Sequence, residues 1–478
     1  MNDLDFITGI IAAKQDLFLA ASKKIWEYAE LPYEEFKSAK LLEDLLIKEG
    51  FTLKKPVVGM PTAFIGSFGE GKPVFGFLGE YDALDGLSQE VPVTKKQPVK
   101  EGAPGHGCGH NLLGVGSLAA AIACKEYLKE TKKEGTVLYF GCPAEEGAGS
   151  KQFMARAGVF TDVDFIYTWH PSTENEVQAT RTVAIMGANF EFRGKTAHAG
   201  SSPHLGRSAL DTAELMNIGV NYLREHMIDQ ARIHYAYADA GGTAPNVVQD
   251  YSRIKYEVRA PKVAQVKELF ARVVNVAKGA ALMTGTKMNY EITMAFSDYT
   301  TNDALATIAD TALQAVGPPK WTEEDYALAK EYLRSYDAST LKEIKATLAA
   351  SYGEEMLEEL WEKPLASTIR PYDAKYKPYE SGSTDVGDVA YAVPTLNFNI
   401  ATQCLGNVGH TWQNTGQSGS TIGTKGMLTA AKVMALAAIR TREQPEIIEK
   451  AKEIVRKQNG GTYECPLPDE VQPPIGNY

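Results

Sequence analysis

Short apolar runs alternate with helical patterns along the first third of the chain. The small-residue pattern at 111–128 predicts a buried helix, and the pattern at 4–47 predicts two amphipathic helices broken near Pro32. Short, mostly apolar runs of about four to eight residues are typical of buried strands. Three of them occur, at 74–78, 137–140 and 163–167. Strands alternating with helices predict an α/β fold whose central, mostly parallel sheet is flanked by helices.

The pattern changes after residue 183 to the order strand, helix, strand, strand, helix, strand. The predicted elements are 183–192, 207–226, 232–238, 251–258, 263–283 and 288–294. This is the ferredoxin-like βαββαβ arrangement of a small α+β domain. We interpret it as an insertion, because residues of the types that bind metal ions appear before it and occur again only after it. The predicted division is a first domain at 1–184 and 298–478, with the inserted domain at 185–297.

The last part of the chain returns to the α/β pattern. It predicts a strand at 393–400 and helices at 423–440 and 445–457, and the final 20 residues or so are predicted to form a surface tail. A charged helical segment at about 318–365 opens with the capping-box pattern that begins at Thr322. Its charge predicts a solvated excursion on the surface.

Composition narrows the classes of function. A chain of 478 residues with 44% hydrophobic residues exceeds one ordinary core and predicts at least two domains. No apolar run reaches the ~18 residues of a membrane span, and the net charge of −11 disfavours a nucleic-acid partner. Five scattered cysteines and an acidic start predict a cytoplasmic protein with reduced thiols. The expected partner is a small molecule, and an anionic one would need a local arginine or lysine.

The most informative residues lie between and after the predicted strands. Cys108 and His110 stand two residues apart in a glycine-rich run. Further candidates follow the apolar strands: Glu145 and Glu146, His170 and His410. A thiolate, imidazoles and a carboxylate suit zinc or a similar divalent ion. A second carboxylate beside a ligand is what metal-assisted hydrolysis needs as a general base.

Other interpretations of these residues remain open. Cys108 and His110 alone are compatible with a packed glycine-rich turn, and Glu145 with Glu146 is compatible with an acidic surface loop. A cysteine hydrolase would use Cys108 as nucleophile and His110 as base, but residues at i and i+2 align poorly for this and the carboxylates would be idle. A non-catalytic binding protein would have no need of Glu145.

Several motifs resemble those of the M20 family of peptidases and amidohydrolases and occur in the correct order. The resemblance extends over nearly the whole chain. The motifs lie at 106–111, 142–147, 194–199 and 382–388. Within the family, the resemblance is to the B-subunit type of aminobenzoyl-glutamate hydrolase. It implies two divalent metal ions per chain, zinc or manganese, in a catalytic domain that carries an inserted lid and dimerisation domain. A homodimer, or assembly with a related second subunit, is implied as well.

The resemblance also assigns roles to residues. It implies that Glu145 is the general base and that Asp82 supports the metal ligands from behind. Glu80 stands where the peptidase branch has a ligand histidine, which leaves the identity of the metal open. The implied ligands, with the thiolate bridging the two ions, are Cys108, His110, Glu146, His170 and His410.

In the lid, His198 would stabilise the oxyanion, reaching across from the partner chain. Asn246 would contact substrate, and Arg259 could clamp a substrate carboxylate. Ser383 and Thr384, together with Asp385, are expected to line the pocket.

The implied activity is hydrolysis of the amide bond of an N-acyl or N-aroyl amino acid such as aminobenzoyl-glutamate. A dipeptidase of the same superfamily is the alternative. Acidic groups placed to bind a substrate ammonium would favour it, and sequence alone does not reveal them.

Overall fold

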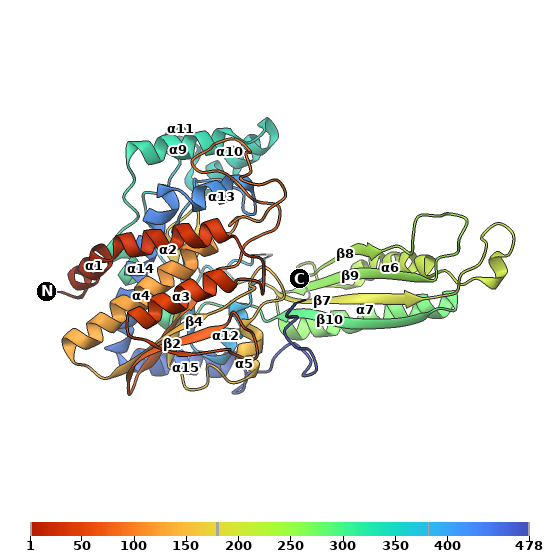
Figure 1. The fold of residues 1–478 in the computed structure, drawn as a ribbon, viewed down its shortest axis with the longest axis horizontal. Coiled ribbons are helices and arrows are strands. Elements are labelled where there is room, and N and C mark those ends of the chain that lie inside the picture. Colours follow the sequence, from red (N-terminus) through yellow and green to blue (C-terminus); the bar gives the residue numbers. More distant parts are fainter. Residues whose placement is uncertain (1, 178–180, 381, 477–478) are drawn as a thin grey trace.

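The computed structural model describes residues 2–177, 181–380 and 382–476, and most of them form a body around one large sheet (Figure 1). Within these residues the sheet has seven strands in the order β1-β2-β4-β3-β5-β11-β6. They are β1 (Thr52–Lys54), β2 (Phe64–Glu70), β3 (Val74–Gly79), β4 (Gly135–Gly141), β5 (Phe165–Ser172), β6 (Glu176–Val177) and β11 (Thr395–Ala401). The central strands β4, β3, β5 and β11 are parallel, whereas β1, β2 and β6 pair antiparallel. The predicted α/β fold with a mostly parallel central sheet is confirmed.

Helices cover both faces of this sheet (Figure 1). They are α1 (Asp3–Ala13), α2 (Gln15–Tyr28), α3 (Phe36–Lys48), α4 (His110–Thr131), α5 (Lys151–Arg156), α8 (Asp303–Val316), α12 (Val386–Ala392), α13 (Trp412–Ser418), α14 (Thr421–Arg442) and α15 (Pro445–Gln458). The prediction of two helices at the N-terminus is wrong. The chain also leaves helical geometry at Lys14, which separates α1 from α2.

The core of the body is built around α4 and α14. The small residues of α4 let it approach the sheet closely: a Cβ on Gly114 would lie 2.6 Å from the Glu80 carbonyl oxygen, and one on Gly116 would lie 2.9 Å from the Trp169 indole nitrogen. Among the described residues, α14 is long and apolar enough to cross a membrane by length and composition. However, 78% of its apolar window is buried inside the protein, where it packs against α4 and α8. We therefore describe α14 as a core helix of the body.

Residues 184–296 form a second unit, here called the insert, which extends away from the body (Figure 1). Its elements are β7 (Ala184–Arg193), the 3₁₀ turn η1 (Pro203–Leu205), α6 (Ala209–Leu223), the 3₁₀ turn η2 (Arg224–His226), β8 (Arg232–Asp239), β9 (Tyr251–Ala260), α7 (Val263–Thr284) and β10 (Lys287–Phe296). The four strands are antiparallel in the order β10-β7-β9-β8, so β8 is an edge strand. The order of elements is the predicted βαββαβ arrangement.

The charged segment near 318–365 contains α9 (Glu323–Arg334), α10 (Ala338–Tyr352), the 3₁₀ turn η3 (Glu354–Met356) and α11 (Leu357–Glu362). The expected capping box is present between Thr322 and Asp325. The segment is more than a solvated excursion, because Tyr332 and Leu333 are fully buried in an apolar cluster with Leu405. It therefore supports the loop that follows β11.

The C-terminal residues are packed against the body rather than forming a loose surface tail. Leu467 is buried, and the Arg156 guanidinium donates hydrogen bonds to the carbonyl oxygens of Pro468 (2.9 Å) and Val471 (2.7 Å). The Tyr463 hydroxyl donates to Asp388 at 2.9 Å. These contacts fix the tail beside α5 and α12.

Candidate active site

The candidate residues of the body meet at one edge of the large sheet. Glu80 directly follows β3, Glu145 and Glu146 follow β4, and His170 lies near the end of β5. Because β4, β3, β5 and β11 are parallel neighbours, their carboxyl ends lie at the same edge, which is where sites form in open α/β sheets. The loop after β11 brings His410 to this edge.

Glycines allow the cysteine motif to fit among these strand ends. Gly109 caps the N-terminus of α4 with φ +84°, a left-handed conformation, and a Cβ there would lie 3.0 Å from Pro171. The carbonyl oxygen of Gly107 accepts a hydrogen bond from the His410 backbone N–H at 3.2 Å. The two motifs, 300 positions apart in sequence, are thus held together by backbone contacts.

Asp82 fixes the orientation of His110 from behind the site. Its Oδ1 lies 2.7 Å from His110 Nδ1, and its Oδ2 accepts a hydrogen bond from the Glu146 backbone N–H at 2.8 Å. This leaves His110 Nε2, fully buried, without a hydrogen-bond partner among the described residues. A buried nitrogen held in this way is prepared to bind a metal ion.

Three sets of side chains bring donor atoms within 4.8 Å of one another and could each hold a metal ion. They are Cys108 with His110 and His170, Cys108 with Glu146 and His410, and Glu80 with His110 and Glu145. Cys108 Sγ lies 3.4 Å from His170 Nε2, and His410 Nε2 lies 3.4 Å from Glu146 Oε1. Since Cys108 belongs to the first two sets, the donors fit a pair of ions that share a thiolate.

The neighbouring carboxylates Glu145 and Glu146 have different electrostatic environments. Burial raises the pKa of Glu145, and the nearby charges of Glu80 and Glu146 raise it further. Burial acts the same way on Glu146, but the close contact with His410 and the charge of His110 outweigh it and lower the pKa of Glu146 to about 2. Pairs of groups whose pKa values are pushed apart are typical of sites that separate proton transfer from charge stabilisation.

Two buried ionisable residues at the site were not identified from the sequence. Lys151 Nζ lies 2.7 Å from Glu80 Oε1 and 2.6 Å from Asp385 Oδ1, and Lys151 is fully buried. Glu35 accepts a hydrogen bond from the backbone N–H of Ala144 (2.8 Å), which has φ +61°, and so supports the turn before Glu145. Neither residue lies in a recognisable motif, and both depend on partners distant in sequence.

A cavity of about 410 Å³ adjoins the candidate ligands. Ser383 and Thr384 line it, whereas Asp385 is fully buried behind it, where its side chain pairs with Lys151. Arg259 of the insert reaches the edge of this cavity, since its Nη1 donates a hydrogen bond to Ser383 Oγ at 3.4 Å. The structure therefore brings Arg259 to the site.

His198 and Asn246 lie elsewhere. Both are exposed and both are on loops at the far end of the insert, beyond the distal ends of β7 and β8 (Figure 1). The two loops contact each other, because the Ala199 N–H donates to the Asn246 carbonyl oxygen at 2.9 Å. Neither His198 nor Asn246 lines the cavity at the candidate ligands of the same chain.

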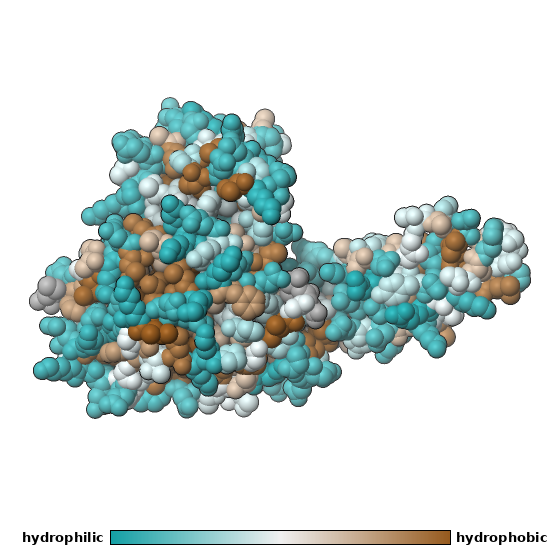
Figure 2. Space-filling model, in the orientation of Figure 1, coloured by the Kyte–Doolittle hydropathy of each residue, from teal (hydrophilic) through white to brown (hydrophobic). Residues whose placement is uncertain are grey.

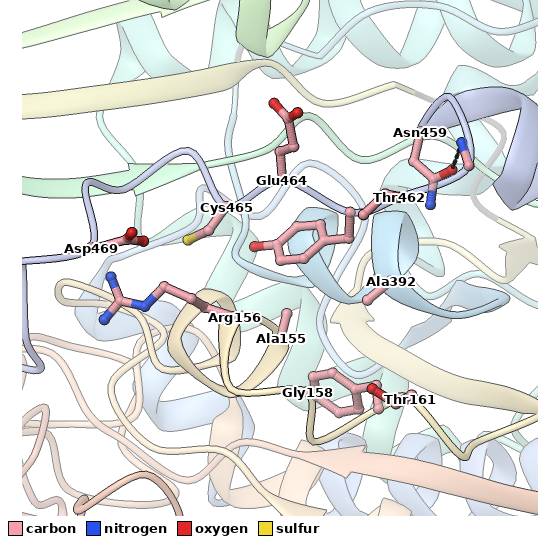
Figure 3. Close-up of a pocket in the computed structure, with 13 residues that line it drawn as sticks. Ala155, Arg156, Gly158, Thr161, Ala392, Asn459, Thr462, Glu464, Cys465 and Asp469 are labelled. Atoms are coloured by element: carbon pink, nitrogen blue, oxygen red, sulfur yellow. Dashed lines mark hydrogen bonds between the residues drawn. The ribbon is translucent and has the colours of Figure 1, made fainter.

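A second cavity, of about 620 Å³, lies between α5 and the C-terminal segment (Figure 3). Its lining includes Arg156, Glu464, Cys465 and Asp469. It contains none of the three possible metal-binding sets, and the Arg156 guanidinium is already occupied by two backbone carbonyls. The smaller cavity beside Cys108 is therefore the candidate active site.

Comparison with known proteins agrees with this geometry. Residues 76–435 match peptidase family M20/M25/M40. The chain belongs to this family. It is therefore an M20 hydrolase that acts on amide bonds, rather than a binding protein or a cysteine hydrolase.

The chain is similar over almost its full length to proteins of two activities. It is 41% identical to the B component of the p-aminobenzoyl-glutamate hydrolase of Escherichia coli (strain K12), over 98% of both chains. It is 28% identical to the mouse Xaa-Arg dipeptidase, over 94% of this chain and 90% of that protein. Its fold is shared with a dinuclear metal-binding M20 peptidase of Bacillus subtilis, with a TM-score of 0.58 at 16% identity, covering 90% of this chain and 99% of the other.

Proposed function

We propose that the protein hydrolyses the amide bond between an acyl or aroyl group and an amino acid, with p-aminobenzoyl-glutamate as the first candidate substrate. The observation that carries the proposal is the convergence of donor atoms around Cys108, with the carboxylate of Glu145 beside them. The substrate is suggested by the E. coli relative, which covers nearly the whole chain.

The proposal includes two divalent ions per chain, zinc or manganese. Cys108 would be the shared ligand, completed by His110 and His170 on one side and by Glu146 and His410 on the other. When bound, such ions polarise the scissile carbonyl and make water a better nucleophile near neutral pH. The thiolate favours zinc, and the carboxylates are also compatible with manganese.

Three residues of the chain would transfer protons, orient a metal ligand and bind the substrate. Glu145 would take a proton from the attacking water and deliver it to the leaving amine. Asp82 would hold the His110 ring in its ligand orientation through the 2.7 Å contact with Nδ1. Arg259, beside Ser383 at the edge of the cavity, would bind a carboxylate of the substrate.

The insert would act as a lid and dimerisation domain, with His198 and Asn246 completing the site of a partner chain. Two features support this proposal. The edge strand β8 is largely exposed, including Tyr235 and Tyr237. Hydrophobic residues also appear at the free end of the insert (Figure 2), where Leu205 and Val247 are exposed. Unpaired strand edges and exposed apolar side chains are common at protein–protein interfaces. The partner would be a second copy or a related chain.

A dipeptidase is the second candidate, because one observation favours it. Glu380 lines the cavity together with the polar side chains of Asn397 and Asn399. A carboxylate at this wall would attract a substrate ammonium or guanidinium group. The similarity to the mouse Xaa-Arg dipeptidase points in the same direction.

A substrate panel tests the proposal. Purified protein loaded with Zn²⁺ or Mn²⁺ would be assayed with p-aminobenzoyl-glutamate, N-acyl amino acids and dipeptides, with and without a chelator. We expect the aroyl or acyl amino acids to be hydrolysed fastest and the chelator to abolish hydrolysis. The Glu145→Gln variant, purified in the same way, controls for contaminating hydrolases. Preferential hydrolysis of basic dipeptides would favour the second candidate, and chelator-resistant hydrolysis would contradict the metal centre.

A cytoplasmic location is part of the same proposal. None of the five cysteines forms a disulfide, and three of them are fully buried. Reduced thiols are typical of proteins from reducing compartments. Fractionation of the source cells would test this.

A further inference from the structure

A buried ammonium group lies directly behind the candidate metal centre. Lys151 opens α5, immediately after the loop that carries Glu145 and Glu146, and its side chain is inaccessible to solvent. The nearest carboxylates are those of Glu80 and Asp385, at 2.7 and 2.6 Å from Nζ. Burying an ammonium is costly unless it is paired and hydrogen-bonded, so this three-residue cluster is a built feature of the site.

The two carboxylates are held in different ways. Asp385 is anchored independently of the lysine side chain, since its Oδ2 accepts hydrogen bonds from the backbone N–H groups of Ser150 (2.9 Å) and Lys151 (3.0 Å). Glu80 pairs with Lys151 through Oε1, while its Oε2 lies 3.4 Å from His110 Nε2. Lys151 therefore bridges a fixed anchor, Asp385, to a carboxylate that faces the metal ligands.

Glu80 could also bind a metal ion itself instead of pairing with Lys151. With His110 and Glu145 it forms the third set of donors within 4.8 Å, and this set shares His110 with the set that contains Cys108 and His170. His110 has only its Nε2 atom to offer, because Nδ1 is engaged by Asp82. Whether Glu80 moves toward a metal ion near His110 or stays with Lys151 decides how many oxygen ligands that ion receives.

We propose that Lys151 is a positioning residue that holds Glu80 out of the metal coordination, so that His110 serves the thiolate-containing set. The inference rests on the proposed metal centre. In this role the Lys151 ammonium would not contact the substrate. It would set the number of ligands on the ion bound at His110, and therefore the Lewis acidity of that ion. Loss of the ammonium would leave Glu80 as an unpaired buried carboxylate, for which a divalent ion is the nearest source of positive charge.

Co²⁺ alone is a suitable probe, because the intensity of its visible absorption falls as its coordination number rises and a thiolate ligand adds a near-ultraviolet band. The wild type would be compared with Lys151→Met, which has a side chain of similar length without the charge. We expect Lys151→Met to bind as many Co²⁺ ions per chain and to keep the thiolate band, with weaker visible bands. Its kcat should fall by about 10–100-fold, the usual effect of changing a residue that supports a metal ligand.

Two further variants separate positioning from a purely structural role. Glu80→Gln should leave the Co²⁺ spectrum unchanged, because Glu80 is not a ligand while Lys151 is present. Glu80→Gln combined with Lys151→Met should restore the wild-type spectrum, because this variant has no Glu80 carboxylate that could move to the metal ion. A spectrum that changes in Glu80→Gln alone, or that stays unchanged in Lys151→Met, would overturn the inference. A wild type that binds Co²⁺ without a thiolate band would instead contradict the proposed metal centre.

Discussion

The body and the insert present their candidate residues in opposite ways. In the body, donors from four strand ends and the start of α4 converge in one site, with His110 fully buried and its ring held by Asp82. In the insert, His198 and Asn246 are exposed on two loops at the end that points away from the body (Figure 1). The three possible metal-binding sets are thus complete within the described residues of one chain, whereas His198 and Asn246 do not line the cavity beside those sets. Under the proposed function, these two residues would act at the pocket of a partner chain.

Substitution of Cys108, the proposed shared ligand, should have the strongest effect. Cys108→Ala should lose at least one of up to two divalent ions and nearly all hydrolytic activity, because Cys108 belongs to two of the donor sets. Metal content would be measured by mass spectrometry and activity by amide hydrolysis. Cys465→Ala, a partly exposed cysteine in the C-terminal segment, is the matched control. Full metal occupancy in Cys108→Ala would remove the thiolate from the centre.

The next effect separates the two adjacent carboxylates. Glu145→Gln should retain the metal ions and lose roughly 10²–10⁴-fold in kcat, the usual contribution of general acid–base catalysis. Glu146→Gln should instead weaken metal binding, because its carboxylate lies in a set with Cys108 and His410. Metal titrations and steady-state kinetics of both variants provide the measurement. The reverse pattern would exchange the two roles.

A smaller effect is expected from the helical segment beside the site. The Tyr336 hydroxyl donates a hydrogen bond to Asn407 Oδ1 and accepts one from the Val408 N–H, both at 3.0 Å, and so holds the loop that carries His410. Tyr336→Phe should weaken binding of one metal ion by about 10-fold. Tyr332→Phe is the control, because that hydroxyl has no hydrogen-bond partner among the described residues. Equal metal affinity in the two variants would show that the segment does not support His410.

The smallest expected effect concerns Glu35 and pH. Burial and the charge of Asp82 raise the pKa of Glu35 from 4.5 to about 8. The folded protein thus keeps a proton that the unfolded chain releases, so this group's contribution to stability is present below pH 4.5 and is lost as the pH rises to about 8. Glu35→Gln can still accept the Ala144 N–H without titrating. Denaturant unfolding from pH 5 to 8 should show stability falling more in the wild type than in the variant. Parallel curves would contradict the assignment.

Sequence patterns predicted the parts of the molecule that depend on local signals. The apolar runs identified β3, β4 and β5, and the residues that follow them are the ones that meet at the site. The antiparallel strand β2 was missed, because its two glycines and polar positions obscure the apolar pattern of a strand.

Residues that depend on distant partners could not be found in this way. Glu35 hydrogen-bonds to a residue 109 positions away, and Lys151 pairs with an aspartate 234 positions away. Burial of a charged side chain is decided by such tertiary contacts and leaves no periodic signal in the sequence. For the same reason, the charge of the segment around Tyr332 suggested a solvated helix although its apolar face is packed.

Complementation between two inactive variants tests the contrast between body and insert most directly. His198→Ala and Glu145→Gln would be purified separately, shown to be nearly inactive with full metal content, and then mixed under conditions that exchange chains between dimers. If the loops at the end of the insert complete a partner's site, each heterodimer contains one intact composite site. We expect hydrolysis to recover in proportion to the fraction of heterodimer. Confirmed heterodimers without any recovery would contradict it, and would place His198 in the site of its own chain or outside catalysis.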